Sequence, residues 1–172
     1  MATPHGSVPP IERNKTYVRI LRARAAKPTR FTSHSTFVTG RFMHWGDEHS
    51  ELCVNPELAC CWCKARYVRL WYGWLFGRDE TSNGPALLQL TAGAVETSII
   101  LREGTHNLRG ATIILTREED RTGSIVTANV SLHRSADRIK GEEPDTLGLL
   151  CRFYKIAFPQ LGHDQGEERR AQ

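Results

Sequence analysis

A cluster of cysteines and histidines between residues 44 and 63 constrains this chain more than any other stretch. It contains four of the five cysteines and two of the seven histidines. Thiolates and imidazoles are the ligands that zinc prefers, and four of them in a tetrahedron make a closed structural site. The odd total of cysteines fits a metal site with a spare thiol better than a set of disulfides. The stretch therefore predicts a zinc knuckle.

The spacing within this stretch suggests which residues bind the metal. Cys60 and Cys63 form a C-x-x-C pair, which lets two thiolates of one tight turn reach the same ion. Cys53 precedes them across a loop, and His44 stands at the end of an expected strand. The predicted ligand set is His44, Cys53, Cys60 and Cys63, with His49 and Cys61 as alternatives.

A catalytic zinc is the less favoured interpretation of the same residues. His49 and Glu51 form an H-x-E sequence ahead of the C-x-x-C pair, as in the zinc-dependent nucleobase deaminases. However, Ala59 stands where that motif has proline, and the gap from Glu51 to Cys60 is too short for two separate helices. The sequence also contains no nucleophile motif or phosphate loop. We therefore expect a structural metal site in a non-enzymatic protein.

Positive charge is concentrated at the start of the chain. Residues 1–45 hold eight lysines and arginines against one acid, although the whole chain has a net charge of only +4. Residues 46–132 hold eight basic and eleven acidic residues. A basic stripe of this kind is typical of proteins that bind polyanions. The alternative is a solvated basic surface without a partner.

Alternating apolar and polar residues predict a mainly β protein. The longest expected strand, residues 65–77, is rich in aromatic and β-branched side chains, whereas the polar residues 27–35 predict a turn. Thr91 is the expected N-cap of a helix over residues 92–103. The other expected strands cover residues 17–25, 85–91, 107–117 and 125–133, and residues 35–45 form a second extended piece that runs into the cysteine cluster.

The order of these elements predicts a five-stranded OB-like barrel with a helix between the third and fourth strands. The zinc knuckle at 44–63 would be inserted between the first two strands of this domain, which we expect to cover residues 15–132. The remaining segments are expected to be an N-terminal tail (1–14), a linker (133–145), a docking helix (146–160) and a C-terminal tail (161–172).

Aromatic and basic side chains gather on the long expected strand. Alternation along residues 65–77 places Tyr67, Arg69 and Trp71 on one face and a more apolar set, including Trp74, on the other. Aromatic rings can stack on bases while cations hold phosphates. Alternatively, Trp71 packs under the knuckle or the C-terminal helix. The predicted nucleic-acid-binding residues are Arg19, Arg22, Arg24, Lys27, Arg30, Arg41, Arg66, Arg69 and Trp71.

This arrangement resembles the OB-fold single-stranded-DNA-binding proteins that carry a zinc ribbon between their first two strands, such as the large subunit of replication protein A. The resemblance covers residues 17–132 in expected topology, and Cys53, Cys60 and Cys63 in motif. His44 stands where such ribbons often have a fourth cysteine. The resemblance implies single-stranded DNA as the partner, RNA as an alternative, and a role in DNA replication.

The expected function is therefore non-enzymatic binding of single-stranded nucleic acid, supported by one structural zinc ion. The alternative is a zinc-stabilised protein-interaction module within a larger complex. The first residues of the chain have no apolar core, and no apolar run is long enough to cross a membrane. We therefore expect an intracellular protein, in the cytoplasm or nucleoid, without a membrane partner.

Overall fold

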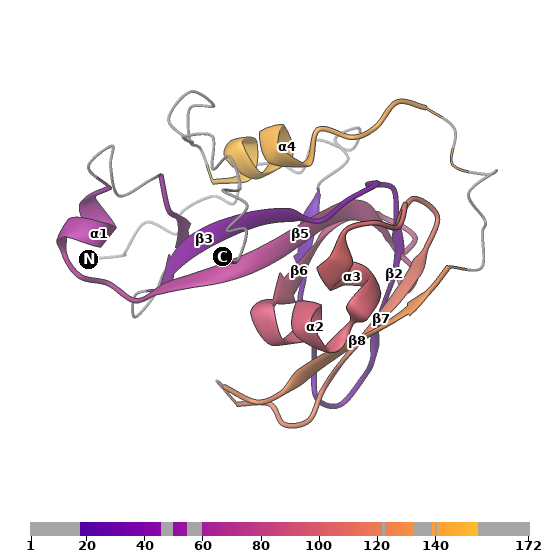
Figure 1. Cartoon of the computed structure of the whole chain (residues 1–172), viewed down its shortest axis with the longest axis horizontal. Coiled ribbons are helices and arrows are strands. Elements are labelled where there is room, and N and C mark those ends of the chain that lie inside the picture. Colours follow the sequence, from indigo (N-terminus) through magenta and orange to yellow (C-terminus); the bar gives the residue numbers. More distant parts are fainter. Residues whose placement is uncertain are drawn as a thin grey trace, which may run out of the picture.

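The computed structural model describes residues 18–45, 50–54, 60–121, 123–132, 139 and 141–154. Strands predominate and the helices are short, as the sequence predicts (Figure 1). In chain order the elements are β1 (Arg19–Leu21), β2 (Thr29–Ser33), β3 (Thr39–Trp45), β4 (Ser50–Leu52), α1 (Cys61–Lys64), β5 (Arg69–Asp79), β6 (Pro85–Thr91), α2 (Ala92–Thr97), α3 (Ile99–Glu103), β7 (Thr112–Arg117), β8 (Val126–Ser131) and α4 (Thr146–Phe153).

The strands form one mixed sheet that is not closed into a barrel. Its main path runs β1-β6-β5-β2-β7-β8, and β3 and β4 branch from β5. The β1–β6 pair is parallel and the other pairs are antiparallel. Within the described residues, β1 and β8 end this path and do not pair with each other. The expected mainly β class is confirmed, whereas the expected five-stranded OB-like barrel is not, because the sheet has eight strands and stays open between β1 and β8.

The expected turn at 27–35 is wrong, because β2 lies in the middle of the sheet between β5 and β7. Phe31 of this strand is completely buried. Its polar neighbours are also buried but have partners: the Thr32 hydroxyl donates to Glu80 at 2.9 Å, and the Ser33 hydroxyl donates to the Ser35 carbonyl at 2.8 Å. Satisfied polar side chains can be buried at little cost, so a polar sequence here still forms a central strand.

Strand β5 organises the sheet and extends beyond it. On one edge it pairs with β3 through Arg69–Trp74 and with β2 through Gly77–Asp79, and on the other edge it pairs with β6 from Tyr72 onward. Residues 69–71 therefore pair with β3 alone. We call β3, β4, α1 and this first part of β5 the arm, which projects at the left of Figure 1.

The beginning of β5 differs from the expected strand at 65–77. Helix α1 covers residues up to Lys64, and Arg66 follows with a positive φ of 59°. A non-glycine residue in that conformation interrupts an extended chain. The strand therefore starts at Arg69 and continues to Asp79.

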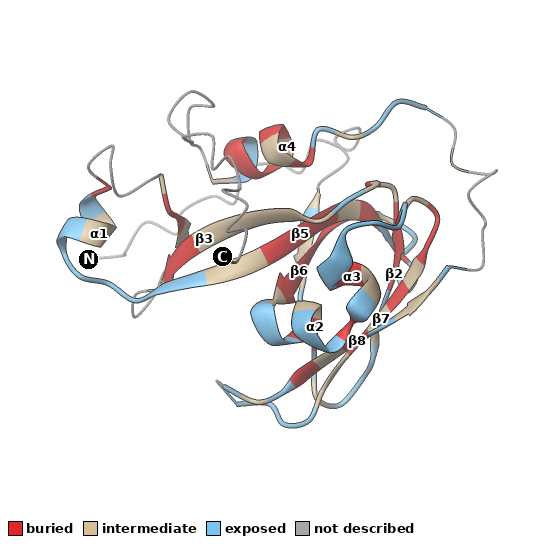
Figure 2. Ribbon diagram, viewed as in Figure 1, coloured by how far each residue is buried: buried red, intermediate tan, exposed pale blue. Residues whose placement is uncertain are grey.

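Both faces of β5 are buried within the sheet (Figure 2). Leu75 packs on one face into a core that also contains Leu88, Ile113 and Leu101 of α3. Trp74 packs on the other face with Leu87, Met43 and Leu150 of α4. The predicted aromatic-basic face of β5 therefore continues into buried Leu75, and only its part on the arm remains partly open to solvent.

The helix expected at 92–103 is divided in two at Ser98. The Thr91 hydroxyl accepts from the Ala94 amide at 3.1 Å, which confirms Thr91 as the N-cap. Ser98 has extended backbone angles and caps α3 through a 3.4 Å hydrogen bond that its hydroxyl accepts from the Leu101 amide.

Within the described parts of the chain, no helix is long and apolar enough to cross a membrane.

Candidate metal centre and basic surface

The four predicted metal ligands come from three segments of the arm. His44 lies on β3, Cys53 follows β4, Cys60 precedes α1, and Cys63 lies within α1. The β3–β4 pairing turns the chain back, and the Cys53 amide donates to the Phe42 carbonyl at 2.9 Å. The turn of α1 is closed by the Lys64 amide, which donates to the Cys60 carbonyl at 3.1 Å. Local backbone structure thus directs all four residues to one place.

Their ligand atoms all lie within 4.8 Å of one another. The His44 Nε2 is 3.3 Å from the Cys63 Sγ and 3.6 Å from the Cys60 Sγ. The Cys53 and Cys63 sulfurs are 3.6 Å apart, and all the cysteines have free thiols. His44, Cys53 and Cys60 are buried. This cluster could hold a metal ion.

The two thiols of the C-x-x-C pair differ in acidity. Burial alone would raise the pKa of Cys60, but backbone hydrogen bonds from Cys63, Val54 and Trp62 outweigh it, so the pKa is lowered. Burial, together with the neighbouring thiols of Cys53 and Cys60, raises the pKa of Cys63 to about 11. A metal ion would remove this mutual repulsion by binding the thiolates in place of protons.

The alternatives for the fourth ligand have different outcomes. Cys61 is exposed and is not part of the cluster, whereas His44 is part of it. His49 lies outside the described residues. The His44 Nδ1 is buried without a hydrogen-bond partner in the described structure, so within it the ring is held only on its Nε2 side. Among the residues that can be compared, His44 is the fourth member.

Four of the predicted nucleic-acid-binding residues lie together. They line a groove of about 160 Å³ between the β1–β2 segment and the turn after β5, which we call the basic groove. Asp79 is the one acid among its described lining residues, and Arg19 already forms an ion pair with it. The lining residues are Arg19, Leu21, Arg22, Arg24, Lys27, Pro28, Thr29, Asp79, Thr81 and Ser82.

Arg22 also contacts a group of side chains that sequence reasoning missed. Its Nε donates to Gln89 at 2.7 Å, and its guanidinium lies 5.6 Å from the centre of the Trp45 ring. The rings of Trp45 and Tyr72 are 6.1 Å apart. A small pocket of about 60 Å³, which we call the seam pocket, is lined by Arg22, Ala23, Trp45, Tyr72, Gln89, Thr91, Arg117 and Val126.

The other predicted nucleic-acid-binding residues do not line the basic groove. Arg69 lies over the Phe42 ring, with its guanidinium 3.8 Å from the ring centre. Trp71 packs against the backbone of Gly40, where an added Cβ would lie 2.8 Å from the indole. This contact gives Trp71 a packing role on the sheet. Arg30 and Arg66 are exposed, and Arg41 is half-buried.

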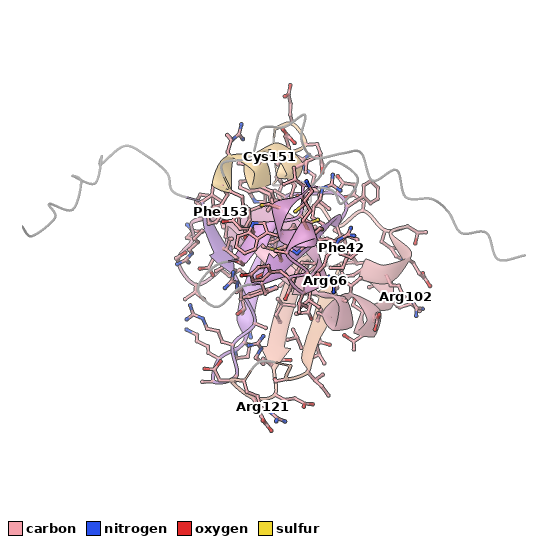
Figure 3. The ribbon with its side chains drawn as sticks, turned by 90° about the vertical axis from the view of Figure 1, so that its left-hand side faces the viewer. Phe42, Arg66, Arg102, Arg121, Cys151 and Phe153 are labelled. Atoms are coloured by element: carbon pink, nitrogen blue, oxygen red, sulfur yellow. The ribbon has the colours of Figure 1, made fainter. Side chains whose placement is uncertain are left out.

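The view along the arm in Figure 3 places Phe42 and Arg66 near the centre, with Arg102 of α3 to one side. The metal cluster and the basic surface are both formed by residues of this one chain.

In comparisons with known proteins, no family model, curated protein or solved structure matches the chain.

Proposed function

We propose that the four-residue cluster holds one zinc ion. In a tetrahedral site, Zn–S bonds of about 2.3 Å and Zn–N bonds of about 2.0–2.1 Å leave roughly 3.5–3.8 Å between neighbouring ligand atoms. Three of the six separations between the four ligand atoms are 3.3, 3.6 and 3.6 Å, within a few tenths of those values, and all six are within 4.8 Å. This agreement is the observation that supports zinc, together with the three-thiol, one-imidazole ligand set.

The site is structural, because four protein ligands leave no open coordination position. It joins β3, the segment after β4, and α1, so it braces the end of the arm. Metal analysis of the purified protein should give one zinc per chain. Cys63→Ser should lose that zinc, while the matched control Cys61→Ser should retain it because Cys61 is exposed and outside the cluster. A wild-type protein purified without zinc, and unable to take it up, would contradict the assignment.

We propose further that the protein is a non-enzymatic single-stranded nucleic-acid-binding protein, DNA being the preferred partner. The supporting observation is the basic groove, where Arg22, Arg24 and Lys27 accompany an Arg19–Asp79 pair that already accounts for the one acid in the lining. Among the described residues these three cations form no ion pair, and such cations attract the phosphate backbone. Trp45, beside Arg22, offers a ring on which a base can stack.

An OB-type topology is compatible with this proposal. Strands β2 and β3 pair with the same edge of β5 and can be regarded as one interrupted strand, and the helices α2 and α3 separate β6 from β7. OB-folds are five-stranded, partly open barrels that bind oligonucleotides on the second and third strands and nearby loops. In this chain the second and third strands would be β5 and β6.

The test is a titration with labelled oligo-dT and with the corresponding RNA at several salt concentrations. We expect binding that weakens steeply with salt, and Lys27→Ala should reduce the affinity. The matched control is Arg102→Ala, a basic residue on α3 that is exposed and lies outside the lining of both pockets. If wild-type protein does not bind either nucleic acid at low salt, the proposal is wrong.

A second candidate function is a protein-interaction module. The favouring observation is on the arm, where Tyr67, Val68 and Leu70 are 44%, 62% and 45% exposed. Exposed apolar side chains in a row can mark a protein contact. This alternative predicts a protein that ignores nucleic acid, and a partner whose binding is weakened by Val68→Ser.

A further inference from the structure

The seam pocket lies where the open sheet has a gap. Arg22 and Ala23 follow β1, while Arg117 ends β7 and Val126 begins β8, so the pocket joins the two ends of the strand path. Trp45 and Tyr72 come from the arm and from β5. The pocket is therefore formed by segments that the sequence places far apart.

Its charge is unbalanced. Two guanidinium groups, those of Arg22 and Arg117, share the lining, and the described lining residues include no carboxylate. The Arg117 Nε is buried and has no hydrogen-bond partner in the described structure. By contrast, the basic groove contains Asp79, which pairs with Arg19. A buried donor on a cation is costly to leave unpaired, so an anion bound in the seam pocket would be stabilised.

We propose that the seam pocket binds one phosphate group. Its volume of about 60 Å³ exceeds the roughly 10–15 Å³ that one water requires, and it is small for a stacked base together with its sugar. Arg117 and Arg22 supply charge-assisted donors, for which phosphate oxygens are the natural acceptors. The Tyr72 hydroxyl stays protonated, since burial raises its pKa, and it is available as a further donor.

The source of the phosphate is a phosphodiester of the bound strand. This identification depends on the proposed nucleic-acid function, but the pocket's preference for phosphate does not. Arg22 lines both the seam pocket and the basic groove, so a strand lying in the groove can place its next phosphate between Arg22 and Arg117. The seam pocket then fixes the position of the strand at one point.

The first part of the test measures binding of labelled oligo-dT to wild type, Arg117→Ala, Arg117→Lys and the control Arg102→Ala. Arg117→Ala should weaken binding about tenfold and flatten the plot of log affinity against log salt by about 0.7, the value for one lost phosphate contact on a single strand. Arg117→Lys should recover part of the lost affinity and part of the lost salt slope. Arg102→Ala should bind like wild type. Equal affinity and equal slope for Arg117→Ala and Arg102→Ala would overturn the seam pocket while leaving nucleic-acid binding intact.

The second part of the test uses inorganic phosphate and compares wild type with Arg117→Ala. Sodium phosphate, compared with sodium chloride at equal ionic strength, should raise the Tm of wild type and change its tryptophan fluorescence, because Trp45 lines the pocket. If oligo-dT fails to bind but phosphate stabilises wild type and not Arg117→Ala, the pocket stands and its ligand is a free phosphate. No effect of phosphate and no effect of Arg117→Ala on DNA binding would reject the pocket altogether.

Discussion

Leu150 provides the sharpest test of how the chain is packed. Its side chain is completely buried in the core that α4 forms with Met43, Leu52, Trp74 and Leu87. Replacing a fully buried leucine by alanine typically costs about 2–5 kcal/mol, as lost burial plus a residual cavity. For a chain of this size, that corresponds to a decrease in Tm of about 4–20 °C. Urea unfolding of Leu150→Ala should therefore show a free energy of unfolding about 2–5 kcal/mol lower than that of wild type.

The matched control is Leu147→Ala on the same helix, since Leu147 is only half-buried and is not part of that core. It should cost less than about 1 kcal/mol, because less apolar area is removed from contact. Both variants keep the Asp145 N-cap, whose side chain accepts from the Gly148 amide at 2.8 Å. Equal unfolding free energies for the two variants would refute the reasoning, because α4 would then not be part of the cooperative fold.

Three further perturbations test other parts of the structure. Removing the metal with a chelator should lower the Tm, and restoring zinc should recover it, as thermal scans can show. The pKa of His34 is lowered from 6.5 by burial and by Arg78 and Arg109. The unfolded chain therefore takes up this proton at a higher pH than the folded chain, and stability should decrease as the pH falls below about 6.5. Urea unfolding across this range should show a weaker dependence of the unfolding free energy on pH for His34→Gln than for wild type. Gly77→Ala should destabilise by about 1–3 kcal/mol in urea, since its Cβ would meet the Thr32 carbonyl, whereas Gly93→Ala, with open space around it, should not destabilise.

The metal cluster could be predicted from sequence because its chemistry is local. The C-x-x-C spacing and the nearby Cys53 restrict the possible ligands to a few residues. The choice of His44 depended on the β3–β4 pairing, which folds Cys53 back toward it. The C-x-x-C spacing favoured Cys60 over the adjacent Cys61, but only the structure shows that Cys61 is exposed.

The sheet was less predictable where burial contradicted polarity. A polar β2 forms a central strand because Thr32 and Ser33 find hydrogen-bond partners, and partners from distant segments are invisible in a sequence pattern. Alternation correctly separated the two faces of β5, but it could not show that both are buried, by α3 on one side and α4 on the other.

The seam pocket shows the same limit at the level of function. Arg22, Trp45, Tyr72 and Arg117 belong to four different segments, and none stands in a recognisable motif. The basic groove was partly predictable, because all four cations of its lining are close in sequence within the first quarter of the chain. A site formed by segments at the two ends of an open sheet can be predicted only when the topology of the sheet is known.

The construction of the arm has a consequence for local opening. Residues 69–71 of β5 pair with β3 alone, while residues 72–74, 77 and 78 pair with a strand on each edge. The proposed zinc would hold the end of the arm at His44 and α1, whereas Met43 and Leu52 of the arm pack into the core with Leu150. We therefore expect the end of the arm to be a separate unit of local unfolding. In hydrogen exchange, stripping the metal should release the amides of β3 near His44 and of the first part of β5, while those of β6 and β7 stay protected.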